Sequence, residues 1–332
     1  MAHLKKICVL LSLALLLLCG GCGTQPQTVR KDLFAMDTLM FFQVYSEDPA
    51  VCDGCIEIIQ SLEAELSATD PASALSVINA DGTGTLSDRA AVLLERTLEI
   101  SGETNGALDP TVYPLSQLWG FPTKDYRQPA EAEITAALTR VGWQNISCQN
   151  GTVRLTNGAQ LDLGAVVKGY AGQLCADYLL QQGVAGSINL GGNAQTVGDK
   201  PDGTPWQIGI ADPDHTAAPI AVLQLQGTNA IVTSGDYQRC FEQDGIRFHH
   251  IMDPATGRPA DTQLRSVTVV CQDGLRADAL STALFVMGME EAADFWRQTR
   301  DFEAVFINTD REIFVTAGLA EQLTNCEFTV IE

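Results

Sequence analysis

The chain has 332 residues, of which 45% are hydrophobic and 18% charged, and its formal net charge is −21. This composition is typical of a globular protein with a core, and it excludes a disordered, collagen-like or coiled-coil chain. The Lys and Arg residues are scattered, so a basic face that binds nucleic acid is not expected. An acidic protein binds a phosphate ligand through a metal ion, backbone N–H groups or one well-placed cation.

The N-terminus has the pattern of a secretion signal. Two lysines precede an apolar run over 7–18, which as a helix would span about 18 Å of a bilayer core that is about 30 Å thick. This length argues against a membrane anchor that stays attached. The sequence then resembles a bacterial lipoprotein cleavage site, with Cys22 as the lipidated residue and Cys19 as the weaker candidate.

We therefore predict a signal peptide over 1–22, a polar tether over 23–30 and one folded unit over 31–332. The mature protein is expected on the extracytoplasmic face of the bacterial cytoplasmic membrane, anchored in the lipid through Cys22.

Seven cysteines remain beyond the signal and the lipidated position. They are Cys52, Cys55, Cys148, Cys175, Cys240, Cys271 and Cys326. An odd number in a chain of this length does not indicate a disulfide framework. Cys52 and Cys55 form a single CxxC pair, which makes a zinc site improbable. We interpret the seven as ordinary thiols, with a redox pair at Cys52 and Cys55 as the alternative.

The hydrophobic pattern of the body predicts both helices and strands. Helical spacing predicts helices over 51–66, 89–101, 131–141, 166–182, 277–287 and 290–299. Strands or hairpin arms are predicted over 33–45, 152–156, 159–163, 186–190, 206–211, 219–226, 229–233, 246–252, 265–272, 303–307, 312–315 and 326–331. Four prolines mark 110–129 as loop-rich. Because helices and strands do not alternate strictly, we predict an α+β fold with mixed or antiparallel sheets and flanking helices.

A strand-to-helix junction at 161–171 contains two glycines, Asp162 and Lys168. A helix N-terminus offers unpaired N–H groups to a phosphate, and Lys168 adds a cation. The spacing is not that of a P-loop. An Asp-capped helix with a surface lysine is the simpler interpretation of these residues taken alone.

A second cluster lies on the predicted helix over 277–287. Asp278 and Thr282 stand one turn apart on the same face, with Ser281 beside them. A carboxylate, a hydroxyl and a backbone carbonyl make an oxygen-only site that suits Mg²⁺. The structural alternative is that Asp278 stabilises the helix dipole while Ser281 and Thr282 bond back to the preceding turn.

Two adjacent histidines, His249 and His250, end a predicted strand. Neighbouring side chains on a strand point to opposite faces, so at most one histidine faces a given site and a metal pair is disfavoured. Histidine is the natural acid or base near neutral pH. Glycine-rich turns at 189–193 and 233–237 allow a ligand to approach the backbone closely, although ordinary turns explain them as well.

Taken in order, these segments resemble the FAD:protein FMN transferases, the ApbE-type flavin transferase lipoproteins. The resemblance covers most of 33–332. The segments that carry it are 35–38, 73–79, 104–112, 118–121, 162–164, 168–171, 189–192, 233–237, 250–257 and 277–282.

The resemblance implies an ApbE-like fold that forms a single catalytic unit. It implies an enzyme that binds FAD and Mg²⁺, cleaves the pyrophosphate and transfers FMN to a Thr or Ser hydroxyl of a partner flavoprotein, releasing AMP. The implied metal ligands are the carbonyl of Ala165 and the side chains of Asp278 and Thr282, with Ser281 close by. The residues implied near the FAD phosphates, the adenosine or the flavin are Met36, Ala107, Leu108, Asp109, Asp162, Lys168, His250 and Ile251.

His250 is the candidate general base for the acceptor hydroxyl, since an unassisted Thr hydroxyl is a poor nucleophile. The partner is expected to be a flavoprotein subunit of a membrane electron-transfer complex. Two alternatives remain open. One is a Mg²⁺-dependent FAD pyrophosphatase, in which water replaces the hydroxyl and FMN and AMP are released. The other is a flavin-binding lipoprotein without catalytic activity.

The chain departs from the family pattern at three places. Asp37 stands where Gly usually follows Met, and Asn193 stands where Asp often follows two glycines. The segment 67–70 lacks an aromatic residue expected to stack on the flavin or the adenine.

Overall fold

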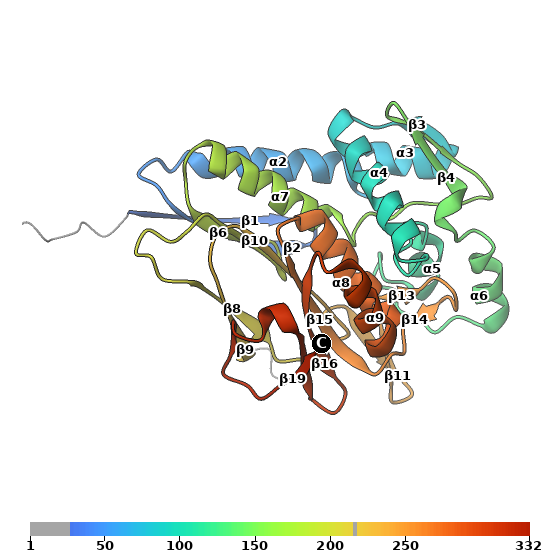
Figure 1. The fold of residues 1–332 in the computed structure, drawn as a ribbon. Helices are drawn as coiled ribbons and strands as arrows, with labels where there is room; N and C mark the ends of the chain where they lie inside the picture. The colour runs from blue at the N-terminus through green and yellow to red at the C-terminus, as the bar shows by residue number, and fades with distance from the viewer. Residues whose placement is uncertain (1–26, 215–217) are drawn as a thin grey trace, which may run out of the picture.

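The computed structural model describes residues 27–214 and 218–332, arranged as Figure 1 shows. The predicted signal peptide and the lipidated Cys22 lie outside the described residues. The described helices are α2 (Val51–Leu66), α3 (Ala74–Asp81), α4 (Asp88–Glu103), α5 (Tyr113–Trp119), α6 (Glu131–Leu138), α7 (Val167–Gln181), α8 (Gly274–Met287) and α9 (Met289–Thr299). Among the described residues no helix is long and apolar enough to cross a membrane.

The described strands form one large sheet and several small ones. The strands of the large sheet are, in spatial order, β1 (Thr28–Ala35), β2 (Thr38–Tyr45), β6 (Gly186–Asn189), β7 (Asn193–Val197), β10 (Asn229–Gly235), β15 (Leu264–Cys271), β16 (Glu303–Asn308), β17 (Ile313–Thr316) and β19 (Thr329–Ile331). The remaining strands are β3 (Thr83–Thr85), β4 (Ile146–Gln149), β5 (Thr152–Leu155), β8 (Trp206–Ala211), β9 (Pro219–Leu225), β11 (Cys240–Gln243), β12 (Ile246–His249), β13 (Met252–Asp253), β14 (Arg258–Pro259) and β18 (Leu323–Thr324).

The large sheet is covered on both faces. Figure 1 shows α2 and α7 side by side above β1, β6 and β10, with α8 and α9 further along the same layer. Strands β8, β9 and β18 form a three-stranded sheet that packs on the opposite face. Because successive side chains of a strand point to opposite faces, one strand contributes apolar side chains to the cores on both sides of the sheet. On β10, Ala230 and Val232 belong to the helix-covered core, and Ile231 between them belongs to the other.

This arrangement confirms the predicted α+β fold with mixed sheets. Neighbouring strands of the large sheet run antiparallel except β17 and β19, which are parallel. The periodic helices are also confirmed: on α2, for example, Ile59, Leu62 and Leu66 face the core, as their spacing predicts.

The N-terminal hairpin joins β1 and β2 through the two residues Met36 and Asp37. Their φ values are +49° and +57°, which is typical of the primed turns that suit the twist of two-residue hairpins. A left-handed conformation at residue 37 explains why glycine suits this position, and Asp is among the residues that tolerate it. Strand β1 begins at Thr28, so the last residues of the expected tether already belong to the sheet.

Three local predictions are wrong. The segment 159–163 forms no strand; Leu161 and Leu163 are apolar because they are buried in the main core. The proline-marked segment 110–129 contains helix α5, because Pro114 occupies its first turn, where proline is tolerated. The helix predicted over 131–141 ends at Leu138.

The seven cysteines of the described residues are free thiols, in agreement with our interpretation. Cys52 and Cys55 are both buried on α2, and burial raises the pKa of Cys52 to about 11. A thiol in that state is uncharged at neutral pH and unreactive.

Candidate functional site

The centre of the candidate site is the carboxylate of Asp278 on α8, which is 4% exposed. Its Oδ2 accepts a hydrogen bond of 2.7 Å from the backbone N–H of Gly169, in the first turn of α7. The first N–H groups of a helix have no partner within the helix, so the carboxylate caps α7 from a neighbouring element. Burial raises the pKa of the Asp278 carboxyl, while nearby Lys168, the Gly169 N–H and the Asn193 amide oppose that rise.

The approach of α7 to α8 depends on two glycines. A Cβ on Gly169 would lie 2.1 Å from the carbonyl oxygen of Gly274, and a Cβ on Gly274 would lie 2.3 Å from the carbonyl oxygen of Gly169. Neither contact is compatible with a side chain. The glycines therefore set the distance at which Asp278 reaches the start of α7.

Three hydroxyls extend the cluster. Ser281 Oγ donates to the carbonyl oxygen of Asp278 at 2.8 Å, so its only proton is in use. Ser234 Oγ, which comes from the end of β10, must then donate to Ser281 Oγ at 2.8 Å. In the remaining contact, 3.2 Å between Ser234 Oγ and Thr282 Oγ1, the Thr282 hydroxyl is then the donor. Both lone pairs of Thr282 Oγ1 are thereby free to face a cation.

This donor set fits Mg²⁺. Asp278, Thr282 and the neighbouring hydroxyls offer only oxygen, which a hard cation prefers. Within the described residues no group of three His, Cys, Asp or Glu side chains could hold a metal ion. A cation at Asp278 would therefore have one carboxylate and several neutral oxygens, which leaves positions for water or a ligand phosphate. The hydrogen bond from Ser281 to the Asp278 carbonyl also confirms the structural alternative for that residue, in which its hydroxyl bonds back to the preceding turn of the helix.

Lys168 and His250 lie near one another at the edge of this cluster. The Lys168 ammonium donates to the carbonyl oxygen of Gly164 at 3.1 Å, and its charge acts on both Asp278 and His250. Burial, together with the positive charges of Arg239 and Lys168, lowers the pKa of His250 to about 3. His250 is therefore neutral at pH 7. Its buried Nδ1 has no hydrogen-bond partner among the described residues.

The two histidines diverge as predicted. The His249 ring packs edge-on against Phe285, and its Nε2 lies 3.0 Å from the carbonyl oxygen of Ala260. The His250 ring instead faces Phe121, with 6.4 Å between ring centroids. Only His250 is turned toward the side of the fold that carries Lys168. Its neighbour Ile251 is buried in the main core.

Other predicted residues form a second group. Asp109 is buried, and its carboxylate accepts hydrogen bonds from the backbone N–H groups of Thr111 and Trp143 and from the Thr111 hydroxyl. Burial raises the pKa of Asp109, and these three hydrogen bonds oppose that rise. Asp162 lies beside this group, since its N–H donates to the carbonyl oxygen of Pro110 at 2.8 Å, and its carboxylate accepts from Gly164. Asp109 thus ties its loop to the segment that begins at Trp143.

The remaining predicted residues are dispersed. Leu108 is buried and Ala107 packs against the main core, so these two support the loop that carries Asp109. The Met36 N–H donates to Glu63 Oε1 at 2.5 Å. The adjacent Asp37 pairs with Lys124 and Arg239, at 3.5 and 3.4 Å. Because the Arg239 carbonyl accepts from the His250 N–H, this turn is linked to the histidine by two contacts.

Two residues of the cluster were not predicted from the sequence as site residues. Ser234 lies in the segment 233–237, which was noted for its glycine and for the family resemblance, and Ser234 itself was not predicted as a site residue. Asn193 was noted only as a departure from a pattern, yet its buried amide lies against Asp278. A hydroxyl directly before a glycine-containing turn was the only local signal for Ser234.

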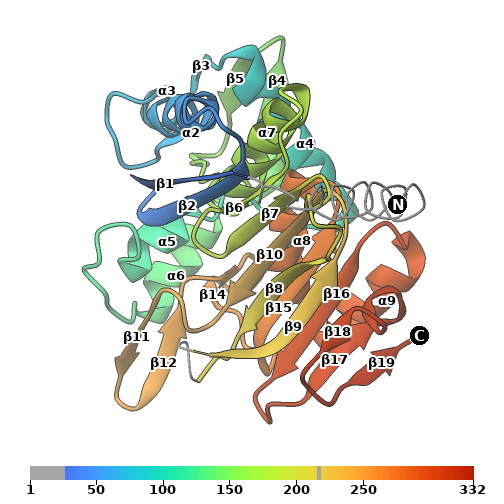
Figure 2. The same ribbon diagram turned by 90° about the vertical axis from the view of Figure 1, so that its left-hand side faces the viewer.

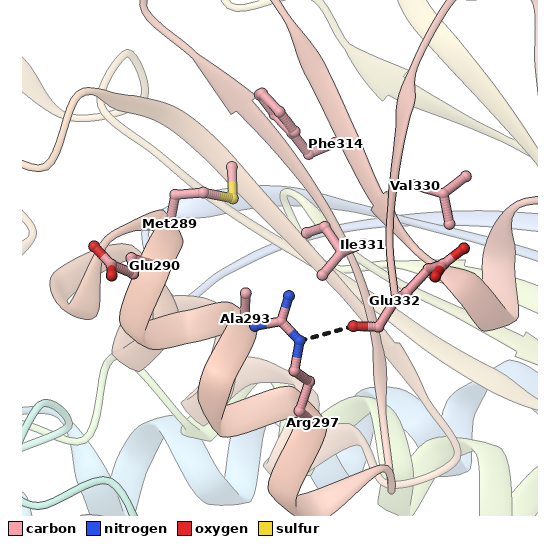
Figure 3. A pocket seen from close by; sticks show the side chains of 8 residues that line it. All are labelled: Met289, Glu290, Ala293, Arg297, Phe314, Val330, Ile331 and Glu332. Carbon is pink, nitrogen blue, oxygen red and sulfur yellow. Dashed lines mark hydrogen bonds between the residues drawn. The ribbon is translucent and has the colours of Figure 1, made fainter.

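Two hollows on the surface lie away from this cluster. One of about 460 Å³ is bounded by α9 and the C-terminal strand, with Arg297, Phe314 and Val330 around it (Figure 3). Another of about 700 Å³ is lined by residues that include Gln224, Val270 and Phe302. Neither contains Asp278, Lys168 or His250, and we assign the site on the convergence of polar groups rather than on the size of a hollow.

The chain is similar to several known proteins. The model of the ApbE family matches residues 36–306. A protein of Treponema pallidum named FAD:protein FMN transferase is 32% identical over 92% of this chain and 91% of its own length. One of the same name from Klebsiella pneumoniae is 35% identical over 85% of this chain and 90% of its own length. The crystal structure of the ApbE protein of Thermotoga maritima superposes with a TM-score of 0.84 at 30% identity, covering 89% of this chain and 99% of that one.

Proposed function

We propose that this chain, which belongs to the ApbE family, is an FAD:protein FMN transferase that depends on Mg²⁺. It would transfer FMN from FAD to a Thr or Ser hydroxyl of a target flavoprotein and release AMP. The observation that carries the proposal is the oxygen-only cluster around buried Asp278, with the N-terminus of α7, Lys168 and neutral His250 beside it. Relatives that match most of the chain bear this activity in their names.

Asp278, Thr282 and the carbonyl of Ala165 are the residues that would hold Mg²⁺. Bound there, the ion would neutralise charge on the diphosphate and make its phosphorus more electrophilic. The Lys168 ammonium would bind the phosphate oxygens, since the N–H groups of Val167 and Gly169 at the start of α7 already donate to Leu163 and Asp278. The net charge of −21 makes such a local arrangement necessary, because the protein as a whole repels a diphosphate.

His250 would act on the acceptor. The ring is neutral at pH 7, but a pKa of about 3 makes it a weak base. The negative charge of a diphosphate bound beside Lys168 would raise that pKa and let the ring accept the proton of the Thr or Ser hydroxyl. The hydroxyl oxygen then forms a bond to the phosphorus of the FMN half, and the bond to the bridging oxygen breaks. AMP leaves with that oxygen, and the hydroxyl proton resides on His250. The buried Nδ1 without a partner is consistent with a ring that gains its partner from the substrate.

We further propose that the protein is a lipoprotein, anchored through Cys22 on the extracytoplasmic face of the membrane, with a membrane electron-transfer subunit as its target. The support comes from the sequence of residues 1–22, with its short apolar run and small residues before Cys22. Metabolic labelling with a radioactive fatty acid, compared between wild type and Cys22→Ala, tests the anchor. Equal labelling of the two proteins would contradict it.

The transferase is tested by mass spectrometry of a candidate acceptor flavoprotein, incubated with residues 27–332, FAD and MgCl₂. We expect the acceptor to gain the mass of FMN less water on a Thr or Ser. Free FMN and AMP without a modified acceptor would indicate a pyrophosphatase. Bound, intact FAD without either product would indicate a flavin-binding lipoprotein.

A further inference from the structure

The outer face of the β1–β2 hairpin exposes three large apolar side chains. Phe34, Leu39 and Phe41 are 69%, 48% and 46% exposed. Phe34 and Leu39 are directly opposite in the strand register, and Phe41 follows Leu39 on the same face. Side chains so placed lie about 5 to 7 Å apart and form one continuous patch.

This patch differs from the other exposed apolar residues of the described chain. Those residues stand singly on separate elements, as Val77 on α3, Val92 on α4 and Leu180 on α7 do. Single exposed apolar residues are ordinary, whereas a contiguous group marks a surface that another molecule covers. On the inner face of the same hairpin Met40, Phe42 and Val44 are fully buried, so the hairpin is apolar on both faces.

The hairpin that carries the patch is linked to the candidate site through its turn. The turn at its end carries Asp37, which pairs with Arg239, and the Arg239 carbonyl accepts from the His250 N–H. Thr38 lies directly against Gly191, where an added Cβ would come within 2.1 Å of Thr38 Oγ1. Figure 2 shows the hairpin, in dark blue, on the same left-hand side of the molecule as α5, α6 and the β11–β12 hairpin.

Two exposed cations stand at the end of the hairpin that carries the patch. Lys124 and Arg239 share the single carboxylate of Asp37 and are 66% and 52% exposed. Carboxylates also lie here, since Glu63 accepts from the Met36 N–H in the same turn and Asp32 lies opposite Phe41 in the strand register. Lys124 and Arg239 are exposed cations on an acidic protein, so a carboxylate of a partner would bind to them and orient its approach.

We propose that the patch of Phe34, Leu39 and Phe41 is the docking surface for the acceptor flavoprotein, which would present apolar side chains near its Thr or Ser and at least one carboxylate toward Lys124 and Arg239. This inference rests on the proposed transferase function and adds the surface that selects the partner. Apolar anchors with a charged rim are the common composition of such interfaces.

The test uses the acceptor that gains FMN in the mass-spectrometric assay. Phe34→Ser, Phe41→Ser and the double variant are compared with Leu180→Ser, a matched control that is 46% exposed on α7. We expect kcat/KM for the acceptor to fall about tenfold or more in the double variant, chiefly through KM. FAD affinity, measured by quenching of flavin fluorescence, and the thermal midpoint should remain those of the wild type. Leu180→Ser should behave as the wild type throughout.

Charge provides an independent measurement. Lys124→Glu should raise KM for the acceptor, and added salt should raise KM for the wild type more than for this variant.

Several results would overturn the proposal. A double variant within twofold of the wild type would do so, as would an equal loss of FAD affinity, which would place the patch in the flavin pocket. Vesicles of phosphatidylglycerol and phosphatidylethanolamine that bind residues 27–332 through the patch, with transfer unaffected by the variants, would assign it to lipid. If the wild type modifies no acceptor while free FMN appears, the transferase function itself fails, and this outcome is distinct from the others.

Discussion

The contact between α7 and α8 gives the sharpest test of how the site is built. A Cβ at Gly169 would lie 2.1 Å from the Gly274 carbonyl oxygen and 2.5 Å from the Asp278 Cβ. These atoms cannot rotate away, so Gly169→Ala must move one helix relative to the other. Overpacking of a core costs about 1–3 kcal/mol, and alanine regains up to about 1 kcal/mol of helix propensity over glycine. With contacts this short we expect a net loss of about 2 kcal/mol.

Gly172 provides the matched control, because it lies three residues later on the same helix. A Cβ there would meet Leu190 Cδ1 at 3.5 Å and Gln195 Oε1 at 3.6 Å, which are ordinary contacts. Gly172→Ala should therefore be neutral or should stabilise the protein by up to about 1 kcal/mol. The two variants make the same chemical change and differ only in what the new methyl group meets.

Equilibrium urea unfolding followed by circular dichroism measures the difference in stability. Calorimetric titration with Mg²⁺ adds a second readout, since moving α7 would lengthen the 2.7 Å hydrogen bond from Gly169 to Asp278 and weaken the metal site. The reasoning is refuted if Gly169→Ala unfolds at the same urea concentration as the wild type, or if Gly172→Ala is the less stable of the two.

The further predictions concern three side chains, which are Asp278, His250 and Asp109. Asp278→Asn should abolish Mg²⁺ binding in calorimetry and FMN transfer with it; retained Mg²⁺ binding would place the metal elsewhere. His250→Gln should lower the transfer rate about 10²- to 10⁴-fold with FAD still bound, and an unchanged rate would exclude it as the base. The pKa of His250 is about 3 in the folded state and 6.5 in the unfolded state. Between these two pH values the unfolded state therefore carries a proton on His250 that the folded state does not. The free energy of unfolding contains a contribution from the neutral ring that is complete above pH 6.5 and is lost as the pH falls, by at most about 1.4 kcal/mol per pH unit. Between pH 4 and 7 the urea midpoint should therefore depend less steeply on pH in His250→Gln than in the wild type. Asp109→Ala should destabilise the fold by about 2–3 kcal/mol in urea, because it leaves the N–H groups of Thr111 and Trp143 without their acceptor; a stable variant with weakened FAD affinity would instead make Asp109 a ligand contact.

The elements that the sequence predicts best are those whose own apolar spacing and capping residues indicate a helix. Helices α2, α4 and α7 follow from apolar spacing and, for α4, from the Ser87 cap, whose hydroxyl accepts from the Ala90 N–H. Strand β7 was unpredicted because its residues Asn193, Gln195 and Thr196 are polar although they are buried between strands. Burial of polar groups depends on tertiary partners, which no local pattern reports.

The same distinction applies to the site. Asp278 and Thr282 were predictable as a pair because helical spacing alone places them on one face. Ser234 reaches the same cluster only because β10 packs under α8, and Lys168 and His250 come together from positions more than eighty residues apart. Asp109 makes a contact that no local pattern reports, because its carboxylate accepts not only from Thr111 but also from Trp143, which lies 34 residues further along the chain; its predicted place near FAD stays a prediction.

The two departures from the family pattern that the structure places near the site have different consequences. At residue 37 the backbone is left-handed, so Asp keeps the turn that glycine would make and adds a carboxylate that holds Lys124 and Arg239. At residue 193 the change removes a charge. A second carboxylate beside buried Asp278 would repel it and raise its pKa further, whereas the Asn193 amide opposes the rise caused by burial. The cluster thus has one ionisable carboxylate, and the negative charge that would balance a bound cation comes from Asp278 alone.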